Sequence, residues 1–215
     1  MNILIACEES QRVADAFRKK GHNAFSCDII PTSGNHPEYH IIDDVRNVLK
    51  PPTTFFSQDY KEHTIKSWDM LIAFPPCTFL SNVAASLYII DKYHEKAVER
   101  LNNRKSAIEF FMCLYNAPIN KICIENPVGC INKIIKPTQI INPYNFGEPY
   151  QKRTCIWLKN LEPLPIIYTK SSFPGEIKNY VYGECSQYSY KTGERSKMRS
   201  KTFISIANAM SETWG

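Results

Sequence analysis

Short apolar runs recur along the first part of the chain, separated by longer polar or amphipathic stretches. Runs of this length are too short for helices and are typical of buried strands. They predict strands at residues 2–6, 23–29, 39–45, 68–74 and 121–127. The connection at 50–60 is rich in Pro, Thr and Phe, and we expect Phe55, Phe56 and Tyr60 to pack it.

Two stretches between these runs have the periodicity of helices. In residues 10–22 the apolar positions recur at helical spacing, namely Val13, Ala14, Ala16 and Phe17. Gly21 is expected to end this helix. A longer helix is predicted over 91–115, with one apolar face formed by Leu101, Ile108, Phe111 and Leu114.

This alternation of strands and helices predicts an α/β fold with a parallel sheet covered by helices on both faces. After Pro137 only short β-like pieces follow, at 138–144, 154–158 and 179–183, and the helix 202–214 closes the chain. We therefore expect one domain, 1–215. Its core is 1–136, a β-rich segment covers 137–200, and the helix within 201–215 completes the core.

The composition is that of a soluble globular protein, with 43% hydrophobic and 22% charged residues among 215. No apolar run approaches the roughly 20 residues that cross a bilayer, so no membrane partner is expected. The N-terminus lacks the basic start of a signal peptide, which predicts a cytoplasmic protein. The net charge of +5 permits nucleic acid as a partner without requiring it. Nothing in the sequence predicts an oligomeric state.

The eight cysteines are scattered and form neither a C-x-x-C pair nor a dense framework, at positions 7, 27, 77, 113, 123, 130, 155 and 185. Reduced thiols are therefore expected rather than disulfides. The histidines show no ligand spacing either, so no metal site is predicted.

Polar and reactive residues stand where the predicted strands end. The strand ends carry Cys7 to Ser10, Cys27-Asp28, Asp43-Asp44, Pro75-Pro76-Cys77 and Glu125-Asn126. Ligands of parallel sheets bind beyond these carboxyl ends, and carboxylates accept hydrogen bonds from ribose hydroxyls and amines. The alternative is that such acids are ordinary turn and cap residues.

Four segments, in this order, resemble the DNA cytosine-5 methyltransferases. "DMLIAFPPCTFLS" is similar to the family's Pro-Cys loop and "IENPVG" to its Glu-Asn-Val segment. "FGEPYQKRTCIWL" looks like its Gln-x-Arg-x-Arg strand, and "RSKTFISIANAM" is similar to its closing segment. The chain looks closer still to small phage-encoded proteins of this type. The resemblance implies a Rossmann-like methyltransferase fold, S-adenosylmethionine as cofactor and DNA as substrate.

The resemblance also implies roles for particular residues. Cys77 becomes the nucleophile that attacks C6 of cytosine, Glu125 the protonated carboxyl near N3, and Asn126 the residue that holds the loop. Arg153 hydrogen-bonds the pyrimidine O2 or steadies Cys77. The competing interpretation makes Cys77 a core thiol and Glu125 a solvated turn acid.

For the cofactor, the resemblance places the ribose on Asp28 and the adenine amine on Asp44. The turn of Cys7, Glu8, Glu9 and Ser10 and the later Asn208 flank the methionine part. The remaining positions expected to line this pocket are Ile29, Val45, Phe74 and Pro75.

The chain departs from the family in three places. The first turn, "ACEESQ", lacks the family's glycines, so Glu8, Glu9 or Ser10 take up contacts there. Cys155 stands where the family has a second arginine. The segment 155–195 is too short for a large target-recognition region, which predicts low sequence specificity or single-stranded targets.

The tail 190–201 is basic, and we expect a solvated loop or a segment that contacts phosphates through Lys191, Arg195, Lys197, Arg199 and Lys201. Two other functions stay open: the same thiol chemistry on a free pyrimidine nucleotide, or a non-catalytic protein that binds or sequesters a nucleotide-like ligand.

Overall fold

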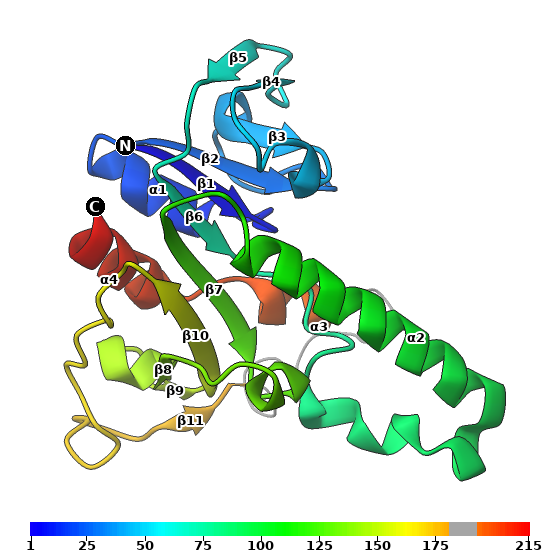
Figure 1. The fold of residues 1–215 in the computed structure, drawn as a ribbon. Helices are drawn as coiled ribbons and strands as arrows, with labels where there is room; N and C mark the ends of the chain where they lie inside the picture. The colour runs from blue at the N-terminus through cyan, green and yellow to red at the C-terminus, as the bar shows by residue number, and fades with distance from the viewer. Residues whose placement is uncertain (181–192) are drawn as a thin grey trace.

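A seven-stranded sheet forms the centre of the molecule, with strand order β3-β2-β1-β6-β7-β10-β8 (Figure 1). The computed structural model describes residues 1–180 and 193–215, apart from the side chains of 83–85 and 195–197. The strands of the central sheet are β1 (Asn2–Ala6), β2 (Asn23–Asp28), β3 (His40–Ile42), β6 (Met70–Ala73), β7 (Lys121–Pro127), β8 (Gln139–Ile141) and β10 (Thr154–Lys159). The other elements are α1 (Arg12–Lys19), β4 (Thr53–Phe56), β5 (Glu62–Ile65), α2 (Ile90–Tyr115), β9 (Tyr150–Gln151), β11 (Lys178–Asn179), α3 (Glu194–Ser200) and α4 (Ile204–Trp214).

The sheet is mostly parallel, as the alternation of elements predicts. Strands β3, β2, β1, β6 and β7 all run in one direction, while β10 is antiparallel to both β7 and β8. The chain builds outward from β1 through β2 to β3 and then returns to place β6 on the other side of β1. The switch point between β1 and β6 is where such sheets bind ligands, beyond Ala6 and Ala73.

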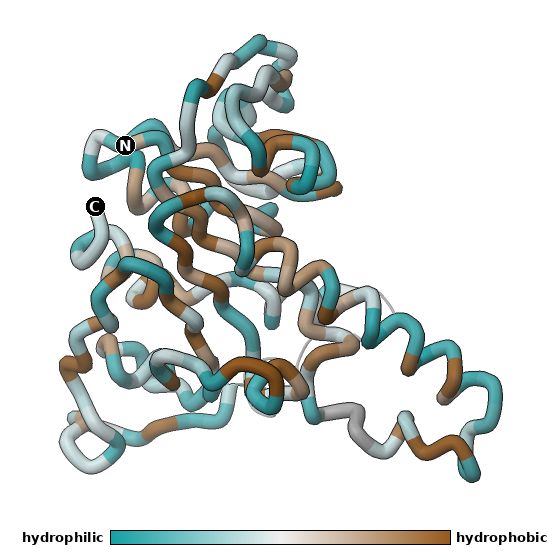
Figure 2. Tube along the Cα trace, in the orientation of Figure 1, coloured by the Kyte–Doolittle hydropathy of each residue, from teal (hydrophilic) through white to brown (hydrophobic). Residues whose placement is uncertain are grey.

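The two faces of the sheet are covered differently. On one face Phe17 of α1 and Met210 of α4 pack against Ile3 and Ile5 of β1. On the other face only the last turns of α2 reach the sheet, and the rest of the cover comes from the hairpin β4–β5 and connecting segments. Figure 2 shows the hydrophobic colour concentrated along the central strands between these layers. The predicted helical cover of both faces is therefore fully present on one face alone.

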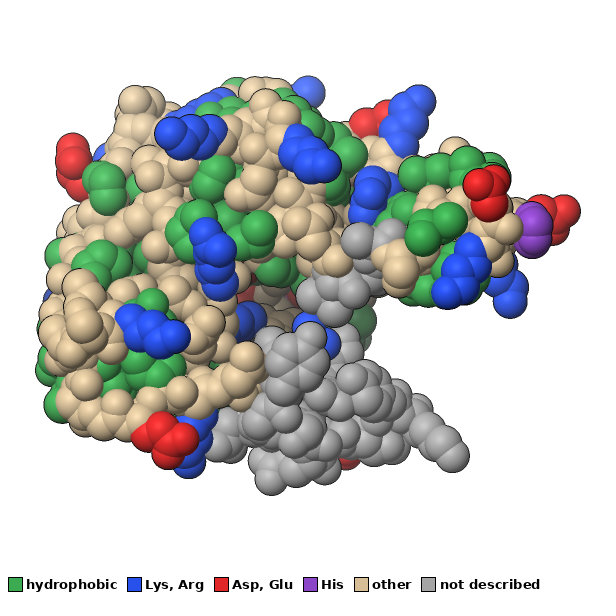
Figure 3. All heavy atoms as spheres, turned by 90° about the horizontal axis from the view of Figure 1, so that it is seen from below, with side chains coloured by type: hydrophobic (Ala, Val, Ile, Leu, Met, Phe, Trp, Pro, Cys, Tyr) green, Lys and Arg blue, Asp and Glu red, His purple; other side chains and the backbone are tan. Residues whose placement is uncertain are grey.

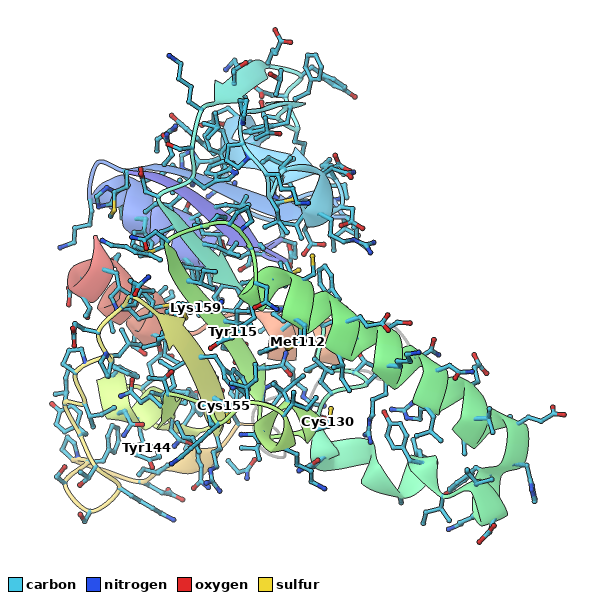
Figure 4. The ribbon with its side chains drawn as sticks, in the orientation of Figure 1. Met112, Tyr115, Cys130, Tyr144, Cys155 and Lys159 are labelled. Atoms are coloured by element: carbon cyan, nitrogen blue, oxygen red, sulfur yellow. The ribbon has the colours of Figure 1, made fainter. Side chains whose placement is uncertain are left out.

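The end of α2 is tied to β10. Phe111 meets Trp157 edge-on, with ring centroids 5.0 Å apart. Lys159 donates to the main-chain oxygen of Tyr115 and lies 4.1 Å from its ring centroid (Figure 4). These contacts fix the base of the helix on the body of the protein.

The outer part of α2 projects from the body as an arm, alongside the 3-10 helix Asn82–Tyr88 (Figure 1). The helical path is interrupted at His94, where φ is 46° and ψ is −125°. The predicted apolar face is buried at Phe111, but Leu101 is 37% exposed because the helix has left the sheet there. The periodicity therefore predicted the helix and overstated its buried length.

Three predictions about local structure are wrong, and a fourth falls mostly outside the described residues. Residues 50–60 were expected to form a connection without a strand, but Thr53–Phe56 pairs with Glu62–Ile65 in an antiparallel hairpin. Alternate burial along β4 places Phe55 in the core, as expected, while Phe56 is exposed. The described part of the tail forms the helix α3 instead of a loop. The β-like piece at 179–183 contributes only to β11, and its later residues, like Cys185 and Lys191, lie outside the described residues.

Candidate active site

Cys77 follows β6, and Glu125 lies near the end of the neighbouring parallel strand β7, directly after the last residue of β7 that pairs with β6. The oxygen of Cys77 accepts from the amides of Leu80 (3.1 Å) and Ser81 (2.9 Å), so the chain turns back directly after the thiol. Cys77 itself is exposed. This combination of a closed turn and an accessible sulfur is what a nucleophile requires and what a core thiol lacks.

The segment that carries Cys77 is fixed from the side of β7. The Asn126 amide donates to the Pro75 oxygen at 2.7 Å, and the Cys130 amide donates to the Leu80 oxygen at 2.8 Å. Between them lies Gly129, where a Cβ would come within 2.0 Å of the Leu80 oxygen. The sequence "ENPVG" therefore supplies both an anchor for the loop and the space for its close approach.

Glu125 is partly buried and lines a small cavity of about 20 Å³, large enough for one water molecule. The cavity is lined by Glu125, Lys152, Thr154, Ser200, Thr202, Phe203 and Ile206. Burial raises the pKa of the Glu125 carboxyl, while the charge of Lys152 and a hydrogen bond from Thr154 oppose the shift. The carboxyl is therefore easier to protonate than a solvated glutamate.

The Cys77 thiol is subject to opposing charges. Burial and the negative charge of Glu125 raise its pKa, and the positive charges of Lys152 and Arg199 lower it. Protonation of Glu125 removes the unfavourable charge, so a neutral Glu125 favours the Cys77 thiolate. Two cations at this site, Lys152 and Arg199, are thus placed to stabilise a negative sulfur.

Arg153 lies elsewhere. Its side chain is exposed, and its charge acts on Cys155. Lys152 and Thr154 line the cavity together with Glu125, whereas Arg153 and Cys155 are not part of its lining. Sequence reasoning missed Lys152, Thr154 and the contribution of Arg199. Counting back two residues from Thr154, the first residue of β10, would have identified Lys152 as a candidate for the same face.

The first loop brings Cys7 close to the acids of the next two strands. Burial raises the pKa of Cys7 to about 12, with further contributions from the charges of Asp28 and Asp44. Cys7 and Gln11 both have left-handed backbone, with φ of 58° and 57°. The turn therefore adopts, without glycine, a conformation that glycine would favour, and unusual backbone of this kind is concentrated at functional sites.

Glu8 and Glu9 have different surroundings. The Glu8 carboxylate accepts from the amides of Val13 (2.6 Å) and Ala14 (3.2 Å), so it holds the first turn of α1. Burial raises its pKa to about 7. Glu9 is 8% exposed and accepts from the Ser33 amide through Oε2 at 3.0 Å. Its Oε1 is buried and has no hydrogen-bond partner among the described residues.

The other predicted cofactor residues are placed as follows. Asp28 is partly buried and accepts a 3.4 Å bond from the Ile30 amide, and burial raises its pKa. The neighbouring Ile29 is 74% exposed. Asp44 pairs with Arg46, and the hydrogen bonds from that side chain lower its pKa.

Four further positions complete that set. Val45 is buried in the core, Pro75 is buried beside Asn126, and the Phe74 amide donates to the Ala6 oxygen at 2.9 Å. Ser10 is partly exposed in the first turn. Asn208, on α4, has an exposed side chain. Phe74 thus lies beside the end of β1 at the switch point, while Val45 is part of the core.

The described residues contain no group of His, Cys, Asp and Glu side chains arranged to hold a metal ion. Among the described helices, none has an apolar stretch of the length needed to cross a membrane.

No protein-family model matches this chain, and no curated protein sequence does. Among solved structures, the chain is similar to the Entamoeba histolytica methyltransferase EhMeth, with 13% sequence identity and a TM-score of 0.42. The similarity covers 82% of this chain and 57% of that structure, so the chain spans little more than half of its length. The fold itself is mixed α/β with a seven-stranded, mostly parallel sheet.

Proposed function

We propose that this protein transfers a methyl group from S-adenosylmethionine to C5 of cytosine in DNA, with Cys77 as the nucleophile. The observation that carries the proposal is the placement of Cys77 after β6 and of Glu125 near the carboxyl end of the adjacent parallel strand β7. The thiol of an exposed residue on a tightly held loop lies within the electrostatic range of a partly buried carboxyl whose pKa is raised. The motif resemblance in the sequence assigns the same two residues to this chemistry.

The chemistry begins with Cys77. Its sulfur forms a bond to C6 of the pyrimidine, the C5=C6 π electrons shift to form a C4=C5 double bond, and the C4=N3 π electrons move to N3, which takes a proton from Glu125. C5 becomes nucleophilic and accepts the methyl group, and the N3 proton returns to Glu125. Loss of the C5 proton to a base then re-forms the double bond and expels the Cys77 thiolate.

Lys152 supports the Cys77 thiolate in this scheme, whereas its charge opposes the protonation of Glu125. Its ammonium lowers the pKa of Cys77 and of Glu125, and its Nζ donates to the main-chain oxygen of Arg199 at 2.8 Å. This bond holds the lysine between β10 and α3. A cation so placed stabilises the thiolate before attack and after release.

The residues of the first loop fit S-adenosylmethionine. The unpaired, buried Oε1 of Glu9 requires a donor, and the ammonium of the methionine part is one. Asp28 has acceptor capacity for ribose hydroxyls, and the exposed Ile29 offers an apolar surface to the adenine. When bound, the cofactor supplies an electrophilic methyl group on a sulfonium.

DNA is the proposed substrate, read with little sequence specificity. Seen from below, the surface is hollowed between the body and the arm, and Lys or Arg side chains border the hollow (Figure 3). Phosphate attraction of this kind does not depend on sequence and weakens with salt. Of the basic residues in the tail, Arg199 acts on Cys77, and Lys201 lies 3.4 Å from the hydroxyl of Ser33. Lys191 and the side chains of Arg195 and Lys197 are outside the described residues.

The test uses DNA that contains 5-fluorocytosine together with S-adenosylmethionine. Fluorine at C5 prevents the final elimination, so the protein should remain covalently attached to the DNA. We expect the adduct in the parent and in Cys113→Ala, a matched change at another exposed thiol, and none in Cys77→Ala. An adduct in Cys77→Ala would overturn the assignment of the nucleophile.

Labelled S-adenosylmethionine distinguishes the remaining possibilities. We expect the labelled methyl group to appear in DNA. Bisulfite sequencing should then show modified cytosines in a context of one to three bases. Label in a free pyrimidine nucleotide would move the substrate to the nucleotide class. If calorimetry detected no binding of S-adenosylmethionine, the proposed enzymatic function would be contradicted, and a protein that sequesters a ligand would be favoured.

A further inference from the structure

The two residues that follow Cys77 are held by side chains of the arm. The Thr78 oxygen accepts from Arg100 at 3.2 Å, and the Phe79 oxygen accepts from Arg104 Nε at 3.0 Å. The Tyr88 hydroxyl donates to the same Phe79 oxygen at 3.0 Å. Both carbonyls directly after the thiol are therefore fixed by α2 and the 3-10 helix before it.

The donors are themselves held in place. The Arg104 guanidinium lies 3.3 Å from the centroid of the Tyr88 ring, and Arg100 lies 5.1 Å from that of Phe79. An arginine stacked on an aromatic ring keeps its planar fork in one orientation. Hydrogen bonds from a charged donor are also stronger than neutral ones. The result is a rigid connection between the arm and the loop.

This connection complements the one from β7. Asn126 holds Pro75, before the thiol, while the arm holds Thr78 and Phe79, after it. Cys77 lies between the two points of attachment. The arm is thus connected by specific hydrogen bonds to the loop that carries Cys77.

We propose that Arg100, Arg104 and Tyr88 are positioning residues, which hold the carbonyls of Thr78 and Phe79 so that Cys77 presents its sulfur at a set angle. The inference rests on the proposed function for its catalytic meaning, and its structural part can be measured without any methyl transfer. The charges that act on the Cys77 thiol are those of Glu125, Lys152 and Arg199. The effect of the arm is therefore on geometry, and the titration of the thiol should not change with it.

The experiment compares Arg104→Met, Arg104→Lys and the matched control Lys105→Met, an exposed neighbour on the same helix. Hydrogen exchange is followed at the amides of Leu80 and Ser81, which close the turn on Cys77. Alkylation of Cys77 by iodoacetamide is followed by peptide mapping over a range of pH, with the exposed Cys113 as the internal reference.

We expect Arg104→Met to speed exchange at Leu80 and Ser81 at least about tenfold, since the charge-assisted bond that holds the Phe79 oxygen within this turn is lost. The midpoint of Cys77 alkylation against pH should not move, the melting temperature should change little, and Arg104→Lys should restore part of the protection. In a methyl-transfer assay with labelled S-adenosylmethionine and unmodified DNA, Arg104→Met should lower kcat while KM stays near that of the parent.

Unchanged exchange at Leu80 and Ser81 in Arg104→Met would overturn the proposal, as would a shifted alkylation midpoint, which would indicate an electrostatic role. An equal loss of protection across the sheet would also overturn it, because the arginine would then stabilise the fold as a whole. If exchange responds as expected and no adduct forms even in the parent, the proposed function fails while the connection between arm and loop stands.

Discussion

The side-chain amide of Asn126 donates a hydrogen bond of 2.7 Å to the main-chain oxygen of Pro75, and both residues are buried. The bond joins the end of β7 to the loop after β6. It explains why two prolines precede an exposed thiol: the loop has few conformations of its own, and one donor is enough to hold it.

Replacing Asn126 by Ala should leave the Pro75 oxygen buried without a donor. The free energy of unfolding should fall by about 1 to 3 kcal/mol. Urea unfolding measures this, and Asn103→Ala, an exposed asparagine on α2, is the control. Stability equal to that of the parent would mean that the loop does not depend on this bond.

Gly129→Ala tests the close approach to the loop. The backbone of Gly129 is extended, with φ of −167°, so alanine introduces no backbone strain there. Its Cβ would lie 2.0 Å from the Leu80 oxygen, and we expect a loss of about 1 to 3 kcal/mol in stability or a displaced loop.

Gly21→Ala is the matched control for this steric effect. A Cβ at Gly21 meets open space, although φ of 85° adds strain of its own. Hydrogen exchange at Leu80 should therefore increase in Gly129→Ala and not in Gly21→Ala. The same exchange rate in both variants would contradict the clash.

Lys152→Met and Arg153→Met separate two neighbouring cations. The charge of Lys152 lowers the pKa of Cys77, so its removal should raise that pKa. Less thiolate is then present at neutral pH, and alkylation of Cys77 should slow several-fold, with its pH profile moved to higher pH. Arg153→Met should leave the profile in place. A shift with Arg153→Met alone would favour the assignment made from the sequence.

Glu8 should make stability depend on pH. Burial raises its pKa in the folded protein to about 7, from 4.5. The folded state then binds the proton more tightly than the unfolded state, so this contribution is complete below pH 4.5 and is lost as pH rises through 7. The loss is on the order of 3 kcal/mol.

Urea unfolding of the parent and of Glu8→Gln between pH 4.5 and pH 8 measures this contribution. The glutamine does not titrate, so the difference in stability between the two proteins should change across this range in favour of the variant. A constant difference would show that Glu8 does not titrate there.

Local patterns in the sequence were sufficient to predict the elements that are buried and regular. The strands predicted at 2–6 and 121–127 agree with β1 and β7 to the residue. A short apolar run bounded by polar residues is too short for a helix and is typical of a buried strand. The mostly parallel order followed from the alternation with helices. The hairpin β4–β5 was missed because Pro51 and Pro52 precede a short strand whose alternation becomes visible only through burial.

The sequence by itself determined which residues stand at the strand ends, since each follows an apolar run, and it thereby identified Cys77 and Glu125 as candidates. Only the tertiary structure decided which side chains share a face with them. Lys152 lines the cavity of Glu125 and Arg153 does not, because both lie in the irregular link between β9 and β10, where no strand periodicity sets the direction of a side chain. The hydrogen bonds from Arg100 and Arg104 to the oxygens of Thr78 and Phe79 likewise depend on how α2 packs against a loop that precedes it in the chain. No local sequence pattern specifies that packing.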